Sequence, residues 1–209
     1  MITVECEMKL KDKVHIKHFV QKQNYEPFLK DLLIQTPMFS DKLELVTEQS
    51  CGEGDFFDPD ENIFYEATLL VNSKIVSNII KNTAYVTSED FLKQRTTDLI
   101  EIFYERLESK KNKKMPLIIF NIFPDIFPKI RDSVTQLITS DKVDLIINEL
   151  VAQNKGMLVE KNIFFVSYNA DGNFYIREIY PRRFGVHHIG VYDRNTFPFE
   201  IIKSSISFG

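Results

Sequence analysis

The stretch CGEGDFFDPDENIFYEATLLV, residues 51–71, decides how the first half of the chain is expected to fold. Residues 58–62 read Asp-Pro-Asp-Glu-Asn. Such a cluster is typical of a turn, because proline presets φ and because Asp and Asn tolerate tight backbone geometry. Aromatic residues and an isoleucine lie on either side of it. The stretch therefore predicts a β-hairpin with residues 59–62 as its loop.

Two carboxylates are expected to face each other across this hairpin. The expected cross-strand pairs are Asp58–Ile63, Phe57–Phe64, Phe56–Tyr65 and Asp55–Glu66. Directly opposed residues have Cβ atoms about 4.5–5.5 Å apart, and like charges at that separation destabilise the pair. A divalent cation or a shared proton would relieve the repulsion. A different register, with both carboxylates in solvent, would relieve it as well.

Upstream of the hairpin, the hydrophobic pattern predicts a strand, a helix and a second, short strand. Polar and apolar residues alternate over 2–11, which is typical of a strand with one exposed face. Apolar residues recur at helical spacing over 24–35, which predicts an amphipathic helix. Residues 43–48 then predict the short strand.

Downstream, the pattern predicts a long strand at 63–71, a helix from about 88 to 107 and a central strand at 117–123. The last is a continuous apolar run, LIIFNIF, which is typical of a strand covered on both faces. Two helices are expected next, over about 125–139 and 141–154. The chain is then expected to end in an antiparallel β-meander, with strands at 163–168, 174–180, 186–192 and 199–205.

Together these elements predict an α/β (α+β) fold, with a mixed central sheet flanked by helices and a C-terminal antiparallel β-meander. Residues 1–155 are expected to form the α/β core. Residues 156–209 are expected to form the meander, packed on the same core, so that a single domain is also compatible with the pattern. The length of 209 residues suits either arrangement.

Charge is distributed unevenly along the chain, although the net charge is only −4. Residues 41–61 contain eight acids and one base, and residues 106–114 contain five bases and one acid. A metal site beside a basic track for phosphates would produce this pattern, and so would two solvated surface segments. The acidic chain as a whole is not typical of a protein that coats nucleic acid, since Lys and Arg drive phosphate binding.

Cysteine use and hydropathy point to the cytoplasm. Cys6 and Cys51 form no CxxC pair and no disulfide framework, which is typical of a reducing compartment. The first residues, MITVECEMKL, carry charge where a signal peptide would be apolar. No apolar run approaches the 18 or more residues of a transmembrane helix, so no membrane association is expected.

The order helix, strand, hairpin, helix and apolar strand, over about residues 24–123, resembles the core of the PD-(D/E)XK nuclease superfamily. In that family an Asp and a following Glu or Asp hold a divalent metal, and a Lys two residues later positions or activates the attacking water. The resemblance implies that Asp55 and Glu66 are catalytic metal ligands for Mg²⁺ or Mn²⁺. Thr68 stands where the family has lysine, and threonine supplies no positive charge.

Further site residues follow from the same resemblance. Lys74 is the candidate for a relocated catalytic lysine, and Glu48 is the candidate for a third metal ligand. Glu26 and Asp31 are weaker candidates for an acid that the family often carries on its first helix. The implied activity is metal-assisted hydrolysis of phosphodiesters, or else an inactive core that is kept for binding.

Two basic segments are candidates for contact with a nucleic-acid backbone. Their residues are Lys110, Lys111, Lys113, Lys114, Arg182 and Arg183. A different class of function is also compatible with the sequence, namely a non-catalytic accessory or immunity-type subunit. Such a protein would bind a protein partner through its acidic patch or through the edge of its C-terminal sheet.

Overall fold

The structure is a computed structural model of the whole chain. It describes residues 2–10, 13–47, 54–71, 73, 76–77, 84–86, 101–125, 162–169, 174–180, 187–189 and 199–208. The two helices expected over 125–139 and 141–154 lie outside the described residues, apart from residue 125. So do residues 88–100 of the preceding helix. Residues 101–110 are helical, so this helix ends a few residues beyond the expected end at about 107.

The described strands form two sheets, which confirms the predicted mixed-sheet α+β class. The larger sheet has the order β2 (Glu44–Leu45), β3 (Phe56–Asp58), β4 (Ile63–Leu69), β6 (Leu117–Asp125), β7 (Ile163–Asn169), β8 (Phe174–Tyr180) and β9 (His187–Ile189). Its pairs are antiparallel from β2 to β4, parallel from β4 to β7, and antiparallel from β7 to β9. Parallel pairing places β6 in the middle of the sheet, as its apolar run predicts.

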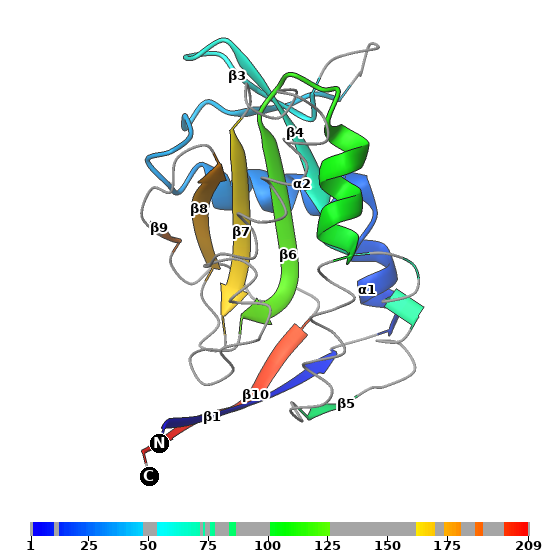
Figure 1. Cartoon of the computed structure of the whole chain (residues 1–209), viewed down its shortest axis with the longest axis vertical. Helices are drawn as coiled ribbons and strands as arrows, with labels where there is room; N and C mark the ends of the chain where they lie inside the picture. Colours follow the sequence, from blue (N-terminus) through cyan, green and yellow to red (C-terminus); the bar gives the residue numbers. More distant parts are fainter. Residues whose placement is uncertain are drawn as a thin grey trace.

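A smaller sheet joins the two ends of the chain. Its order is β10 (Phe199–Phe208), β1 (Ile2–Leu10) and β5 (Ala84–Val86). Strands β1 and β10 lie side by side at one end of the molecule (Figure 1). The expected meander is therefore only partly correct, since β7, β8 and β9 follow one another in the large sheet but β10 pairs with β1. The register explains the pairing, because apolar positions lie opposite apolar positions, as in Val4↔Ile206.

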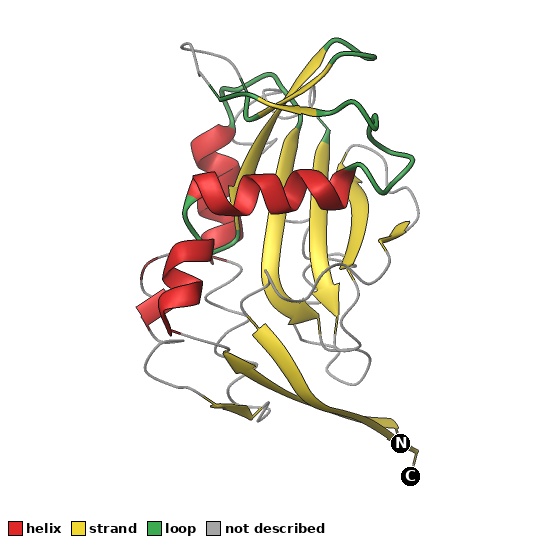
Figure 2. Ribbon diagram, turned by 180° about the vertical axis from the view of Figure 1, so that it is seen from behind, coloured by secondary structure: helices red, strands yellow, loops and turns green. Residues whose placement is uncertain are grey.

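Helices cover both faces of the large sheet. The helix α1 (Lys13–Phe19) is followed by α2 (Lys22–Leu33), and α2 crosses one face, while the helix at 101–110 lies on the other (Figures 1 and 2). The ring of Phe28 in α2 stacks on Phe120 with centroids 6.0 Å apart, and Phe103 contacts Phe165. Among the described residues, no helix is long and apolar enough to span a membrane.

The hairpin at residues 56–69 forms with the expected loop. Its register is Asp58↔Ile63, Phe57↔Phe64 and Phe56↔Tyr65, as the sequence predicts. Asp58 is 1% exposed and fixes the turn, because its Oδ1 accepts hydrogen bonds from the backbone N–H groups of Asp60 and Glu61. Asn62 closes the turn with φ of 54°, a conformation that asparagine tolerates better than most residues.

Candidate active site

The expected fourth pair of the hairpin, Asp55 opposite Glu66, is not formed. The N–H of Asp55 donates to the carbonyl of Tyr65 at 2.7 Å, but the N–H of Glu66 donates to the carbonyl of Pro116 at 2.9 Å. Strand β4 pairs with β6 from Glu66 onward. Backbone pairing with β3 therefore ends one residue before the predicted carboxylate pair.

Where the backbone pairing of β3 with β4 ends, the side chain of Asp55 forms the next hydrogen bond to β4. Its Oδ2 accepts a hydrogen bond from the N–H of Ala67 at 2.7 Å, so a carboxylate replaces a strand as the partner of this backbone group. Gly54 allows the close approach, because a Cβ at that position would lie 2.9 Å from the carbonyl carbon of Tyr65. The carboxylate of Asp55 is thereby fixed at the edge of the sheet.

Asp55 is 1% exposed and is bound to a lysine from the first turn of α2. Lys22 donates from Nζ to Oδ1 of Asp55, and the same Nζ lies 3.6 Å from Oε1 of Glu26. Buried carboxylates are costly unless they are paired, so this ion pair accounts for the burial of Asp55. Lys22 itself keeps about half of its side chain exposed.

Glu66 is bound by two lysines from the end of the helix at 101–110 and the loop after it. Lys110 donates to Oε1 of Glu66, and Lys113 donates to Oε2 at 2.6 Å. The side chain of Glu66 is only 4% exposed. The helix is fixed to the sheet by Arg106, whose Nη2 donates to the carbonyl of Val71 at 2.8 Å.

Lys22 contacts Asp55 and Glu26, and its charge also interacts with that of Glu66. Burial lowers the pKa of Lys22, but the hydrogen bond to Asp55 and the negative charges of Asp55, Glu26 and Glu66 outweigh it, and the pKa is raised above its ordinary value. Lys22 is therefore a firmly held ammonium at neutral pH. We refer to Lys22, Asp55, Glu66, Lys110 and Lys113 as the edge cluster.

Glu26 lies beside the edge cluster with an oxygen that lacks a hydrogen-bond donor. The residue is 8% exposed, and no described group donates to its buried Oε1. Burial, followed by the negative charge of Asp55, raises the pKa of Glu26 from 4.5 to about 7. The positive charge of Lys22 opposes the shift without cancelling it.

The contribution of Glu26 to the free energy of unfolding should fall as the pH rises from about 4.5 to about 7. In that interval the folded chain keeps a proton on Glu26 that the unfolded chain has released, so folding is favoured at the acidic end and loses this contribution at the alkaline end. Urea unfolding across this interval should show that Glu26→Gln, which never ionises, gains on the wild type as the pH rises. Parallel profiles for the two proteins would contradict the assignment.

A pocket of about 450 Å³ opens between α2 and the chain that follows β2. The described residues that line it are Lys22, Gln23, Glu26, Pro27, Leu45, Val46 and Thr47. Its volume is within the usual range for small-molecule sites. Of the edge cluster, Lys22 is among the described residues that line this pocket, beside Glu26.

The donor atoms of the cluster suit a small hard cation. Carboxylate oxygens are the ligands that Mg²⁺ and Mn²⁺ prefer, and Mg²⁺ is commonly held by one or two carboxylates together with waters. Asp55 and Glu66 supply such oxygens, but lysine ammonium groups are bound to them in the structure. Within the described ranges, no three or more His, Cys, Asp or Glu side chains are grouped so that they could hold a metal.

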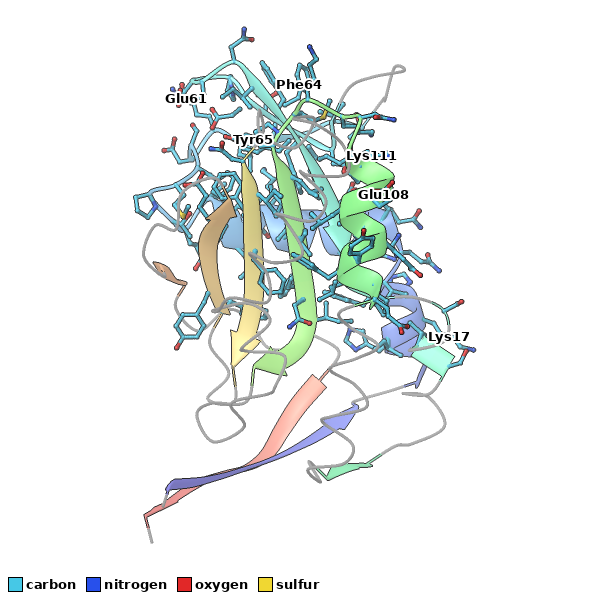
Figure 3. The ribbon with its side chains drawn as sticks, in the orientation of Figure 1. Lys17, Glu61, Phe64, Tyr65, Glu108 and Lys111 are labelled. Carbon is cyan, nitrogen blue, oxygen red and sulfur yellow. The ribbon has the colours of Figure 1, made fainter. Side chains whose placement is uncertain are left out.

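The lysines of the predicted basic segment at 110–114 differ in what they bind in the structure. Lys110 and Lys113 bind Glu66, Lys111 pairs with Glu108, and Lys114 is exposed. Glu108 and Lys111 lie together at the end of the helix at 101–110 (Figure 3). The remaining predicted site residues, which lie outside the described ranges, are Glu48, Lys74, Arg182 and Arg183.

Lys22 was not among the predicted site residues, although the sequence carries a signal for this end of α2. Glu26 falls within the apolar stripe of the helix, between Tyr25 and Phe28, both of which are buried. An acid at such a position needs a partner, and Lys22 is four residues earlier, at a spacing where side chains meet on a helix. The polar residue in this apolar stripe therefore indicates Lys22 as the partner of Glu26, which was already a candidate acid.

No protein-family model, curated protein or solved structure significantly matches this chain. The class that the fold defines is α+β, with a mixed sheet and a charged cluster at the edge of β4.

Proposed function

We propose that this protein is a metal-dependent phosphodiesterase that acts on nucleic acid, as the resemblance to the PD-(D/E)XK core implies. The observation that carries the proposal is the pair of buried carboxylates, Asp55 and Glu66, each of which is bound by lysine. A buried acid whose pKa is strongly raised, as that of Glu26 beside these carboxylates and in the wall of the pocket, is typical of a functional site. The order α2, β2, β3, β4, helix 101–110 and β6 supports the proposal, because the resemblance implies the same order.

In this proposal Asp55 and Glu66 hold Mg²⁺ or Mn²⁺. Glu26 on α2 is the neighbouring acid, in the position of the acid that the resembled family often carries on the first helix of its core. The bound ion would polarise the phosphate and lower the pKa of a bound water. The chain's own lysines have two tasks, because they neutralise the carboxylates before the ion binds and offer positive charge to the substrate afterwards. The proposed location is the cytoplasm, supported by the cysteine use described above.

Incubation with plasmid DNA and with structured RNA should show nicking that requires Mg²⁺ or Mn²⁺ and stops when EDTA is added. Glu66→Gln should lose this activity, because the neutral amide is a poor ligand for a hard cation. Glu108→Gln is the matched control, since it removes a carboxylate near the end of the helix at 101–110 that pairs with Lys111, and it should leave nicking unchanged. Metal-independent nicking, or equal activity in the Glu66 variant, would contradict the proposal. A stable complex with a protein, in the absence of any nicking, would favour the accessory-subunit alternative.

A further inference from the structure

The edge of the large sheet at β2 presents backbone groups for pairing beside the pocket. In the part of the chain that the structure describes, β2 is the outermost strand at this end of the sheet. Val46, directly after β2, donates from its N–H to the carbonyl of Asp55 at 3.0 Å. Backbone groups of successive residues point to opposite sides of a strand, so Leu45 and Thr47 direct theirs away from β3. An added strand would therefore pair at these two residues, both of which line the pocket.

The pocket lies between this edge and the first turns of α2. A groove between a helix and a sheet edge can hold alternate side chains of an added strand, while backbone hydrogen bonds hold the strand itself. Leu45 packs in part against the core and Pro27 lies across from it, so both provide apolar surface for such side chains. Thr47 is exposed, which leaves this end of the edge accessible.

Glu26 places a buried acceptor without a donor in the wall of the pocket. The residue is 8% exposed, and no described group donates to its Oε1. Nζ of Lys22 lies 3.6 Å from that oxygen, beyond hydrogen-bonding distance, and is bound to Asp55. A buried polar atom without a partner costs free energy, so a donor that enters the pocket would be bound favourably.

The charges around the groove favour a basic partner. Asp41 and Glu44 are exposed within and just before β2, and Lys42 between them pairs with Asp60. A lysine or arginine side chain carries the donors that Glu26 lacks and complements these acids. The same acids disfavour the phosphates of a nucleic acid, which are bound by Lys and Arg.

We infer that an extended, basic segment of a partner protein adds a strand to the edge of β2 and donates to Glu26 from a lysine or arginine side chain. This edge is at the other end of the large sheet from β9, so it differs from the C-terminal sheet edge that the sequence suggested for a partner. The inference does not rest on the proposed function, because it requires neither a metal ion nor cleavage.

The test is the affinity of the full chain for a fluorescein-labelled peptide of alternating lysine and valine, measured by fluorescence anisotropy. A peptide with glutamate in place of every lysine should bind at least about tenfold more weakly, because it repels the acids of the groove. Two further peptides carry N-methyl groups on all valines or on all lysines. Only one of these two should lose binding, because the N–H groups of alternate residues face β2. Equal binding of the two methylated peptides would overturn the addition of a strand, and this comparison leaves the protein unchanged.

Two variants of the chain test the two contacts separately. Glu26→Gln should weaken binding of the lysine–valine peptide about tenfold, because a charge-assisted hydrogen bond becomes neutral. Asp31→Asn is its matched control, since Asp31 lies in the same helix but is not among the lining residues. Thr47→Pro should weaken binding by a similar factor, because it removes an outward N–H and keeps the bond from Val46 to Asp55. Thr47→Val keeps that N–H and should bind as the wild type does.

Wild-type affinity in both Glu26→Gln and Thr47→Pro would overturn the inference. So would a wild type that does not bind the lysine–valine peptide, or one that binds a labelled single-stranded oligonucleotide in the same groove. Peptide binding by a wild type that shows no nicking would overturn the proposed function alone.

Discussion

Replacing Lys110 and Lys113 together by methionine should lower the free energy of unfolding by about 3 kcal/mol. The double change removes both positive charges from Glu66, whose side chain is only 4% exposed. A buried carboxylate without a counter-charge is strongly destabilising, whereas one remaining lysine would still compensate it. Each single variant should therefore lose much less stability than the pair, and urea unfolding at pH 7 would measure all three.

The matched control is the double variant Lys111→Met with Lys114→Met, from the same loop. Lys111 pairs with the partly exposed Glu108, and Lys114 is exposed, so their loss should cost less than about 1 kcal/mol. Adding Glu66→Gln to the Lys110 and Lys113 variant should restore most of the lost stability, because the buried charge disappears. Equal losses in the two double variants would show that these ion pairs do not hold Glu66.

The same variant also tests the proposed metal site without any assay of cleavage. If lysines and a divalent cation compete for Glu66, then removing Lys110 and Lys113 should tighten the binding of Mn²⁺. A ligand that binds only the folded chain stabilises it according to its concentration and affinity. Added Mn²⁺ should therefore raise the melting temperature of the double variant more than that of the wild type. Identical increases in the two proteins would contradict a cation site at Glu66.

The local part of this site could be predicted from the sequence. Residues 58–62 fix the hairpin through their own side chains, since Asp58 accepts hydrogen bonds from residues two and three positions later. Such contacts depend only on neighbours in the chain, and the three cross-strand pairs follow from the length of the loop. The central position of β6 was also predictable, because residues 117–123 are apolar apart from Asn121.

The long-range part could not be predicted, because it depends on which segments meet in the folded chain. The fourth pair of the hairpin fails because β3 begins at Phe56, and the side chain of Asp55, in place of its backbone, accepts the N–H of Ala67. On its other edge β4 pairs from Glu66 onward with β6, a strand about fifty residues away in the sequence. The ion pairs of Lys110 and Lys113 with Glu66 form because the connection from β4 to β6 passes beside this carboxylate, and the contact of these lysines with a nucleic-acid backbone stays a prediction. Charge counts along a sequence do not show which opposite charges become neighbours.

Asp55→Asn should reduce cleavage at least about 100-fold while leaving the fold largely intact. Asparagine keeps an oxygen that can accept the hydrogen bond from the N–H of Ala67, but it loses the charge that binds Lys22 and the proposed cation. A metal ion stabilises the transition state by several kcal/mol, and each 1.4 kcal/mol corresponds to a factor of ten in rate. Steady-state cleavage and urea unfolding, measured on the same preparation, would separate the two effects.

Asp58→Asn provides the opposite result in the same hairpin, since Asp58 is as deeply buried as Asp55 but lies outside the edge cluster. Its Oδ1 accepts from two N–H groups and its Oδ2 from the N–H of Ser40, so the amide would lose charge-assisted bonds that fix the turn. Stability should fall by about 1–2 kcal/mol, with cleavage per folded molecule unchanged. If both variants lost activity in proportion to their stability, Asp55 would be a structural acid like Asp58. A loss of activity in Asp55→Asn alone would instead assign a catalytic role to Asp55.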